Sequence, residues 1–219
     1  MSIQQSTELV IFVTHVEAEN SFLKIWGQVD KNSATCVERM ILPLVEQFAR
    51  SQGCVGSQSA NLRINALCCA RFQNEGYYRA KVINIRADGM VVLQFIDYGN
   101  IEVLPPQEIH LLESIPGSES LQSFPPVAFD FTLMHVLPIN GIWENNIIES
   151  IKKTLWYNEY KILIHTVVNN HRFIKLWYNN EDFSELLINK HMAMRATLQE
   201  MFRYLFYIHK YFIQIIKFV

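Results

Sequence analysis

The chain has 219 residues; half of them are hydrophobic and 18% are charged, which is typical of a globular protein and excludes a disordered one. Its length allows one domain or two small ones. The formal net charge is −2, and lysines and arginines are scattered along the chain, so the sequence argues against a dedicated nucleic-acid-binding surface.

The first part of the chain predicts a hairpin and a helix. β-Branched and aromatic residues predict a strand at residues 8–16 and, after a polar turn, another at 22–29. Apolar residues then recur at the spacing of one helix face from 37 to 48. Pro43 lies inside this pattern and is expected to kink the helix or to mark its first turn. Residues 51–61 contain several Gly and Ser residues and are predicted to be a linker.

The middle of the chain predicts four strands joined by tight turns. The strands are expected at residues 66–72, 77–85, 90–97 and 101–104. Asp88-Gly89 stands between apolar runs and is a strong hairpin signal. Pro105-Pro106 is expected to end the strand pairing.

The last part of the chain predicts a second group of strands, beginning near Pro125-Pro126. A strand is expected at 127–136, and a hairpin at 160–168 and 171–178 with Asn169-Asn170 as its turn. Between them, five apolar residues share one face of a predicted helix: Trp143, Ile147, Ile148, Ile151 and Leu155. Three further apolar residues predict a short last helix: Phe183, Leu186 and Leu187.

The C-terminal segment, residues 194–219, does not fit this pattern. From residue 201 onward it is aromatic and aliphatic, but Arg203, Lys210 and Lys217 interrupt it. Each cation at the middle of a bilayer costs roughly 2.5–3.5 kcal/mol, so no membrane span is expected. We expect either a helix that packs on the domain or a poorly ordered segment beyond it.

The cysteines and the N-terminus indicate an intracellular protein. Cys36, Cys54, Cys68 and Cys69 include no C-x-x-C pair, so neither a zinc site nor a disulfide framework is expected. Cys68 and Cys69 are adjacent and should point to opposite faces of a strand, as buried reduced thiols. The N-terminus lacks a charged segment followed by an apolar one, so no signal peptide is expected.

Four aromatic residues and one amide suggest a binding site for a cation. Phe72, Tyr78, Phe95 and Tyr98 stand around two predicted turns, and Asn100 follows the last ring by two residues. A guanidinium or ammonium group between ring faces gains roughly 0.5–2 kcal/mol per good contact. Asn100 can form a hydrogen bond with an N–H that the cation still presents. Four aromatics in a small barrel can also be plain core, but the turn places Tyr98 and Asn100 at a strand end, which favours a cage.

Arg79 and Asp97 adjoin these residues and admit two interpretations. Asp97 could attract a cationic ligand, or it could pair with Arg79 across adjacent strands. A cross-strand pair of opposite charge contributes a few tenths of a kcal/mol to about 1 kcal/mol. We favour the structural pair, with a secondary effect of its field on the ligand.

The same residues resemble the Tudor domain, whose pattern runs A-x-F, a short turn, W/Y-Y-R-A, and F/Y-x-D-Y-G-N-x-E. The chain matches with Ala70-Arg71-Phe72, Asn74-Glu75-Gly76, Tyr77-Tyr78-Arg79-Ala80 and Phe95-Ile96-Asp97-Tyr98-Gly99-Asn100-Ile101-Glu102. Tyr77 stands where Trp is usual, at a wall position rather than a cage position. The resemblance implies the five cage positions of the methylarginine-binding branch: Phe72, Tyr78, Phe95, Tyr98 and Asn100.

The elements on either side make the chain similar to an extended Tudor domain. This resemblance implies a mainly β protein with helices (α+β), in which an SH3-like Tudor barrel stands next to a split staphylococcal-nuclease-like OB barrel. The extended domain is expected at residues 7–193, followed by a hydrophobic tail at 194–219. Within the domain, the Tudor core is expected at 62–114 and the nuclease-like halves at 7–50 and 125–193.

The resemblance also implies a function. Such modules bind the arginine-methylated tails of PIWI-clade Argonaute proteins and act as scaffolds in RNA silencing by the piRNA pathway during gametogenesis. We therefore expect a non-enzymatic reader of dimethylarginine peptides, without a metal or cofactor. Its expected location is the cytoplasm, including perinuclear germline granules.

Two other functions compete with this hypothesis. The first is an OB-type binder of single-stranded nucleic acid or a residual nuclease, because OB barrels commonly stack bases on aromatic rings. Nuclease chemistry needs clustered carboxylates and a cation, whereas Asp130 stands alone on its strand and Arg172 has no evident acidic companion. The second is a methyl-lysine cage, which Asn100 disfavours because a trimethylammonium has no hydrogen to donate.

Overall fold

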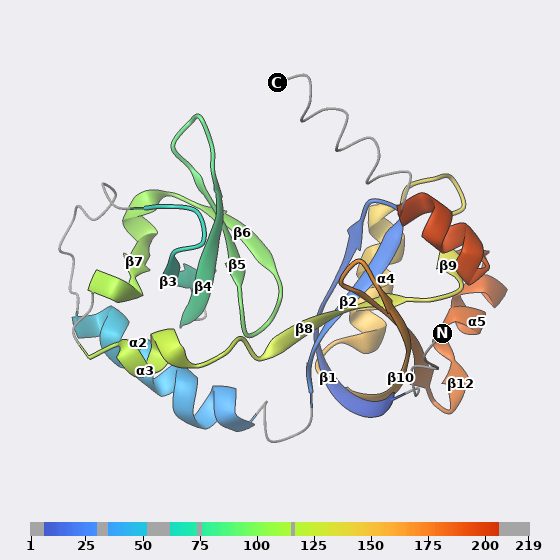
Figure 1. Cartoon of the computed structure of the whole chain (residues 1–219), viewed down its shortest axis with the longest axis horizontal. Helices are drawn as coiled ribbons and strands as arrows, with labels where there is room; N and C mark the ends of the chain where they lie inside the picture. The colour runs from blue at the N-terminus through green and yellow to red at the C-terminus, as the bar shows by residue number, and fades with distance from the viewer. Residues whose placement is uncertain (1–6, 30–34, 52–61, 74–75, 115–116, 206–219) are drawn as a thin grey trace. The chain divides into compact units, whose positions relative to one another are not determined.

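The computed structural model describes residues 7–29, 35–51, 62–73, 76–114 and 117–205 (Figure 1). The chain divides into two compact units. The central unit is Trp26–Phe129, and the terminal unit combines the chain up to Ile25 with the chain from Asp130 onward. The middle of the sequence is therefore an insertion into a unit built from both ends.

The central unit contains an antiparallel sheet of five strands in the order β6-β5-β4-β3-β7. The strands are β3 (Leu67–Phe72), β4 (Gly76–Ile85), β5 (Val91–Phe95), β6 (Ile101–Leu104) and β7 (Ile109–Leu111). The sequence prediction is confirmed for the first four. The fifth was missed because three residues after a di-proline are too few to show a strand period.

Turn residues fix the register of this sheet. In the β4–β5 turn, Gly89 takes a left-handed φ of +82° and donates a hydrogen bond from its N–H to Arg86 O at 3.0 Å. Asp88 Oδ1 accepts a hydrogen bond from Met90 N at 3.0 Å, which supports the same turn. The hairpin signal of Asp-Gly is thereby confirmed.

The side chains of β3 alternate between two cores, as the pleat of a strand requires. Cys68 packs inside the sheet with residues such as Val82 and Leu93, while Cys69 faces the opposite side and packs with Leu112. Both thiols are buried and free, and burial raises the pKa of Cys69 to about 12. The predicted opposite-facing thiols are confirmed; Cys54 lies outside the described residues.

The first helix packs on this sheet. A π-helical turn (Val37–Ile41) runs into α2 (Leu42–Ser51), and Pro43 lies in the first turn of α2, where its missing N–H costs least. The apolar stripe of the helix contacts Leu112 and Leu121, the latter from α3 (Glu119–Ser123). We expected this helix in the N-terminal nuclease-like half, but the structure groups it with the central unit, because its stripe covers the outer face of the sheet.

The terminal unit contains a six-stranded sheet in the order β10-β1-β2-β8-β11-β12. Since β10 also pairs with β11, five of these strands close into a barrel. The strands are β1 (Thr7–Glu19), β2 (Phe22–Val29), β8 (Ala128–Leu133), β10 (Glu159–Val168), β11 (His171–Tyr178) and β12 (Glu181–Asp182). Strand β1 pairs with β10, so segments from both ends of the chain share one barrel.

Helices and short strands complete this unit. Helix α4 (Asn145–Leu155) buries Ile148, Ile151 and Leu155, as the apolar spacing predicts. The β10–β11 turn places Asn169 and Asn170 at φ values of +48° and +67°. The remaining elements are β9 (Val136–Leu137), α5 (Phe183–Asn189) and β13 (Met194–Arg195), which pairs with β9.

The strand predicted at 127–136 is shorter than expected. Strand β8 ends at Leu133, and His135 takes a left-handed φ of +68°. This turn starts the separate strand β9, which pairs with β13 rather than with the barrel strands. The break therefore follows from one residue whose backbone conformation cannot continue a strand.

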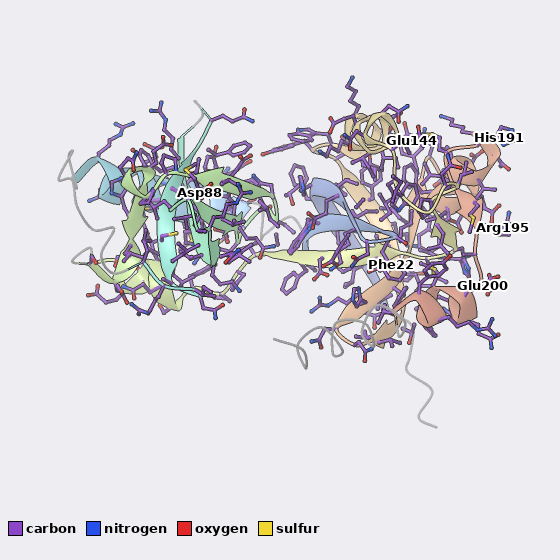
Figure 2. The ribbon with its side chains drawn as sticks, turned by 90° about the horizontal axis from the view of Figure 1, so that it is seen from above. Phe22, Asp88, Glu144, His191, Arg195 and Glu200 are labelled. Atoms are coloured by element: carbon purple, nitrogen blue, oxygen red, sulfur yellow. The ribbon has the colours of Figure 1, made fainter. Side chains whose placement is uncertain are left out.

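The chain continues into the core of the terminal unit beyond the predicted domain end at residue 193. A helix begins at residue 198, and its Met201 and Leu205 are buried against Phe22 and Phe173 (Figure 2). Met201 Sδ also lies 3.2 Å from the backbone N of His135. The predicted packing helix is thus present up to residue 205, and residues 206–219 lie outside the described part of the chain. No helix among the described residues is long and apolar enough to cross a membrane.

We predict that Met201→Ala destabilises the protein by about 2–4 kcal/mol, because it removes a fully buried side chain and leaves a cavity beside Phe173. The matched control is Arg203→Ala, on the exposed face of the same helix, which should leave stability nearly unchanged. Urea denaturation followed by circular dichroism measures both. Equal effects of the two substitutions would show that this helix does not belong to the folded core.

Candidate functional site

The four predicted cage rings lie together in the central unit. Ring centroids are 6.2 Å apart for Phe72 and Tyr78, 5.5 Å for Phe72 and Phe95, 6.0 Å for Tyr78 and Phe95, and 5.3 Å for Tyr78 and Tyr98. Every one of these pairs is close to perpendicular, with interplanar angles of 73–90°. Edge-to-face packing of this kind is favourable and turns ring faces in several directions.

Burial divides the five predicted residues into two groups. Phe95 is 1% exposed and belongs to the core of the sheet. Phe72, Tyr78 and Tyr98 pack against that core and are partly exposed, and so is Asn100. The alternative of plain core, which the sequence left open, therefore describes Phe95, whereas the three other rings reach the surface. Phe95 forms a floor beneath the exposed rings.

The turn after β5 positions Tyr98 and Asn100. Gly99 has a φ of +96°, and its N–H donates to Phe95 O at 2.7 Å, while Phe95 N–H donates to Asn100 O at 2.9 Å. These bonds close the chain back onto β5 and hold both side chains at the strand end. The turn predicted from Tyr-Gly-Asn is confirmed.

Trp26 of β2 covers this turn and was missed in the sequence. A Cβ built on Gly99 would overlap the indole of Trp26, with its Cε3 only 2.6 Å away. Two residues further along β2, Gln28 Nε2 donates to Asp97 O at 2.8 Å. The pattern of β2 alone gives no sign of either contact, because the two segments are about 70 residues apart.

Arg79 and Asp97 form a buried, bidentate ion pair. Arg79 Nε donates to Asp97 Oδ2 at 2.9 Å, and Nη2 donates to Oδ1 at 2.7 Å. The remaining guanidinium hydrogens go to backbone oxygens of Leu121, Phe124 and Pro125 at 2.7–3.0 Å. Side-chain exposure is 0% for Arg79 and 3% for Asp97.

The structural pair that we favoured from the sequence is therefore present, but it is much more buried than the exposed cross-strand pair that we assumed. Asp97 Oδ1 also lies 3.3 Å from Val127 N, which donates to it. The carboxylate is thus occupied by internal donors and is shielded from solvent. It holds the segment after α3 against β4 and is not a direct partner for a ligand.

The wall residue Tyr77 faces away from the cage rings. It packs beside the core between α2 and the sheet, with its ring centroid 5.7 Å from that of His110. Its backbone N–H donates to Glu46 Oε1, on α2, at 2.9 Å. Tyr77 and Tyr78 therefore serve opposite faces of β4, as strand alternation requires.

The terminal unit corrects one statement made from the sequence. Asp130 does not stand alone, because its carboxylate lies 2.9 Å from Lys24 Nζ and 3.3 Å from Arg172 Nη1. Arg172 thus has an acidic companion, and Lys24 is shared with Glu19 at 2.6 Å. Hydrogen bonds to Glu19 and Asp130 raise the pKa of Lys24, and burial opposes them. Among the described residues, no group of three or more His, Cys, Asp or Glu could hold a metal ion.

A family model for the Tudor domain matches residues 5–135, which is more than half of the chain. The chain belongs to the Tudor domain family. Human Tudor domain-containing protein 1 is 33% identical over 91 residues, which is 41% of this chain and 7% of that relative. Human Tudor domain-containing protein 6 is 31% identical over 103 residues, 46% of this chain and 5% of that relative. The matches therefore span less than a tenth of the length of either relative.

Solved structures show the fold. Extended Tudor domain TD3 from mouse TDRD1, in complex with a MILI peptide containing a dimethylarginine, has a TM-score of 0.71 at 18% identity, over 87% of this chain and 94% of that one. The human TDRD1 extended Tudor domain, in complex with a symmetrically dimethylated peptide, has a TM-score of 0.70 at 20% identity, over 90% and 94%. The fold is that of an extended Tudor domain, as the sequence predicts.

We predict that Gly99→Ala lowers stability more than Gly89→Ala does. Both glycines have a positive φ, so both substitutions carry a similar backbone cost, but only a Cβ at residue 99 meets another group, the indole of Trp26. The difference in melting temperature between the variants isolates the clash. Equal shifts would mean that Trp26 can move away from the turn without cost.

A second prediction concerns the ion pair. Asp97→Asn leaves the Arg79 guanidinium buried without a counter-charge, which should cost about 3–5 kcal/mol. The control is Asp88→Asn, an exposed acid in the same unit whose side-chain oxygen can still accept from Met90 N (Figure 2). Chemical denaturation should show a large loss for the first variant and almost none for the second; similar losses would contradict the argument.

Proposed function

We propose that this chain is a non-enzymatic reader that binds dimethylarginine in peptides. The observation that carries the proposal is the cluster of three partly exposed rings over the buried ring of Phe95, with Asn100 at the end of the same turn. Ring faces attract a cation, and each good contact contributes roughly 0.5–2 kcal/mol. The nearby carboxylate of Asp97 does not compete with the rings for the ligand, because it is occupied by Arg79.

This combination suits a methylated guanidinium better than an unmodified one. Methylation keeps the positive charge, removes N–H donors and adds apolar surface. An unmodified arginine brings five N–H groups, which lose their water partners on entering a ring cluster. One amide, Asn100, can satisfy the few donors that a dimethylated group retains. The same amide favours arginine over trimethyllysine, which has no donor.

The similar structures support this choice of ligand. The two TDRD1 extended Tudor domains are in complex with dimethylated peptides, one of them from MILI. A third structure is the Drosophila melanogaster Papi extended Tudor domain, as a single-residue variant, with a Piwi N-terminal R10me2s peptide; its TM-score is 0.68 at 15% identity. From these we propose arginine-methylated tails of PIWI-clade proteins as the partners.

A scaffolding role in the piRNA pathway follows from that choice of partner. A reader without an enzymatic step joins a modified tail to whatever else its own chain binds. We propose cytoplasmic germline granules as the place where such assemblies form. Localisation of a tagged chain before and after inhibition of arginine methylation tests this part separately from peptide binding.

The rival function is binding of single-stranded nucleic acid by the OB-type barrel of the terminal unit. A backbone-tracking groove needs cations that are available to phosphates. Lys24 and Arg172 both pair with Asp130, which argues against such use. The same assay with labelled single-stranded RNA gives a direct comparison with peptide affinity.

We predict that a symmetric dimethylarginine peptide binds more tightly than its unmodified twin, with a dissociation constant on the order of micromolar to tens of micromolar, because one anchored side chain must offset the ordering of the peptide. Tyr98→Ala should abolish most of this affinity, while Tyr204→Ala, an exposed tyrosine of the terminal unit, should not change it. Isothermal titration calorimetry measures each case. Equal affinity for the two peptides would disprove methylarginine reading.

A further inference from the structure

A carboxylate of α2 lies at the edge of the ring cluster. Glu46 Oε1 accepts the hydrogen bond from Tyr77 N, at the start of β4. A Cβ built on Gly76 would lie 2.7 Å from Glu46 Oε1 and 4.0 Å from Cε2 of the Tyr78 ring. The carboxylate and one cage ring therefore border the same small space, which the absence of a side chain at Gly76 leaves open.

The present cationic partner of Glu46 is weakly held. Arg50 Nε lies 3.3 Å from Glu46 Oε2, in an i,i+4 pair along the helix. The side chains are 81% exposed for Arg50 and 33% exposed for Glu46. Exposed pairs of this kind contribute little to stability, because water and salt screen them and the long side chains lose entropy. A cation delivered by a ligand can therefore replace Arg50 at small cost.

We propose that Glu46 pairs with a second, unmodified cation of the peptide whose dimethylarginine occupies the ring cluster. The inference rests on the proposed function, since the cage must first anchor the peptide. In an extended peptide, alternate side chains point the same way and stand about 7 Å apart. The ligand class is therefore a peptide with arginine or lysine two residues from the dimethylarginine.

Glu46 and the rings would then divide the recognition between them. The rings respond to methylation, whereas a carboxylate outside the ring cluster responds only to charge. Glu46→Gln is the appropriate variant, because glutamine keeps an oxygen that accepts from Tyr77 N and loses only the charge. Any change in binding then comes from the charge and not from a displaced β4.

The test is a double-mutant cycle by calorimetry. One peptide carries dimethylarginine-Gly-Arg, its twin carries dimethylarginine-Gly-Gln, and a second pair places the variable residue on the N-terminal side. The wild-type chain should bind the arginine member of one pair about two- to fivefold more tightly than its glutamine twin. Glu46→Gln should remove this preference and keep the preference for methylated over unmodified peptide.

Arg50 provides a test with the opposite sign. Arg50→Ala removes the competing cation, so it should raise affinity for the two-cation peptide. Arg86→Ala, an exposed arginine of the β4–β5 turn, removes the same charge elsewhere and should change little at physiological salt.

The two proposals can fail separately. A wild-type chain that prefers methylated peptide but treats arginine and glutamine twins alike in both pairs would overturn the role of Glu46 and leave the cage standing. A chain without any preference for methylation would overturn both. A charge preference that survives in Glu46→Gln would place the second cation on another residue and so overturn the role of Glu46.

Discussion

The ion pair between Arg79 and Asp97 is the interaction on which the candidate site depends. Its five short hydrogen bonds join β4, the turn after β5 and the segment that follows α3. A buried pair of this kind is not a large net source of stability, because desolvation offsets most of the attraction. Its value here is positional, since the guanidinium holds several separate pieces of backbone in fixed places.

That fixed backbone explains why the ring cluster can form at a surface. Tyr78 comes immediately before Arg79 on β4, and Tyr98 comes immediately after Asp97. Strand alternation sends the ion pair to one side and the rings to the other. Trp26 then closes the turn from outside by packing over Gly99. Exposed rings therefore stand on residues whose neighbours in the chain are among the most tightly held of the described protein.

Local patterns predicted most of these elements, and contacts between distant segments explain the rest. Strands β3 to β6 and their turns follow from alternation and from residues such as Gly89 that tolerate a left-handed backbone. The stripe on α2 showed that the helix packs on something, but a stripe does not identify its partner. In the same way, Asp130 looked isolated because Lys24 and Arg172 reach it from strands far away in sequence. The contacts of Trp26 and of the helix from residue 198 were missed for that reason too.

The placement of charge around the rings determines what the site can distinguish. A free carboxylate within the rings would reward unmodified arginine, whose five N–H groups it could satisfy best. Asp97 cannot do this, because Arg79 has already taken its oxygens. The rings are left to respond to charge and apolar surface together, which only a methylated cation offers in full. An acid at the periphery, such as Glu46, can then add attraction for cations without weakening that selectivity, because it stands outside the group of rings that receives the methylated side chain.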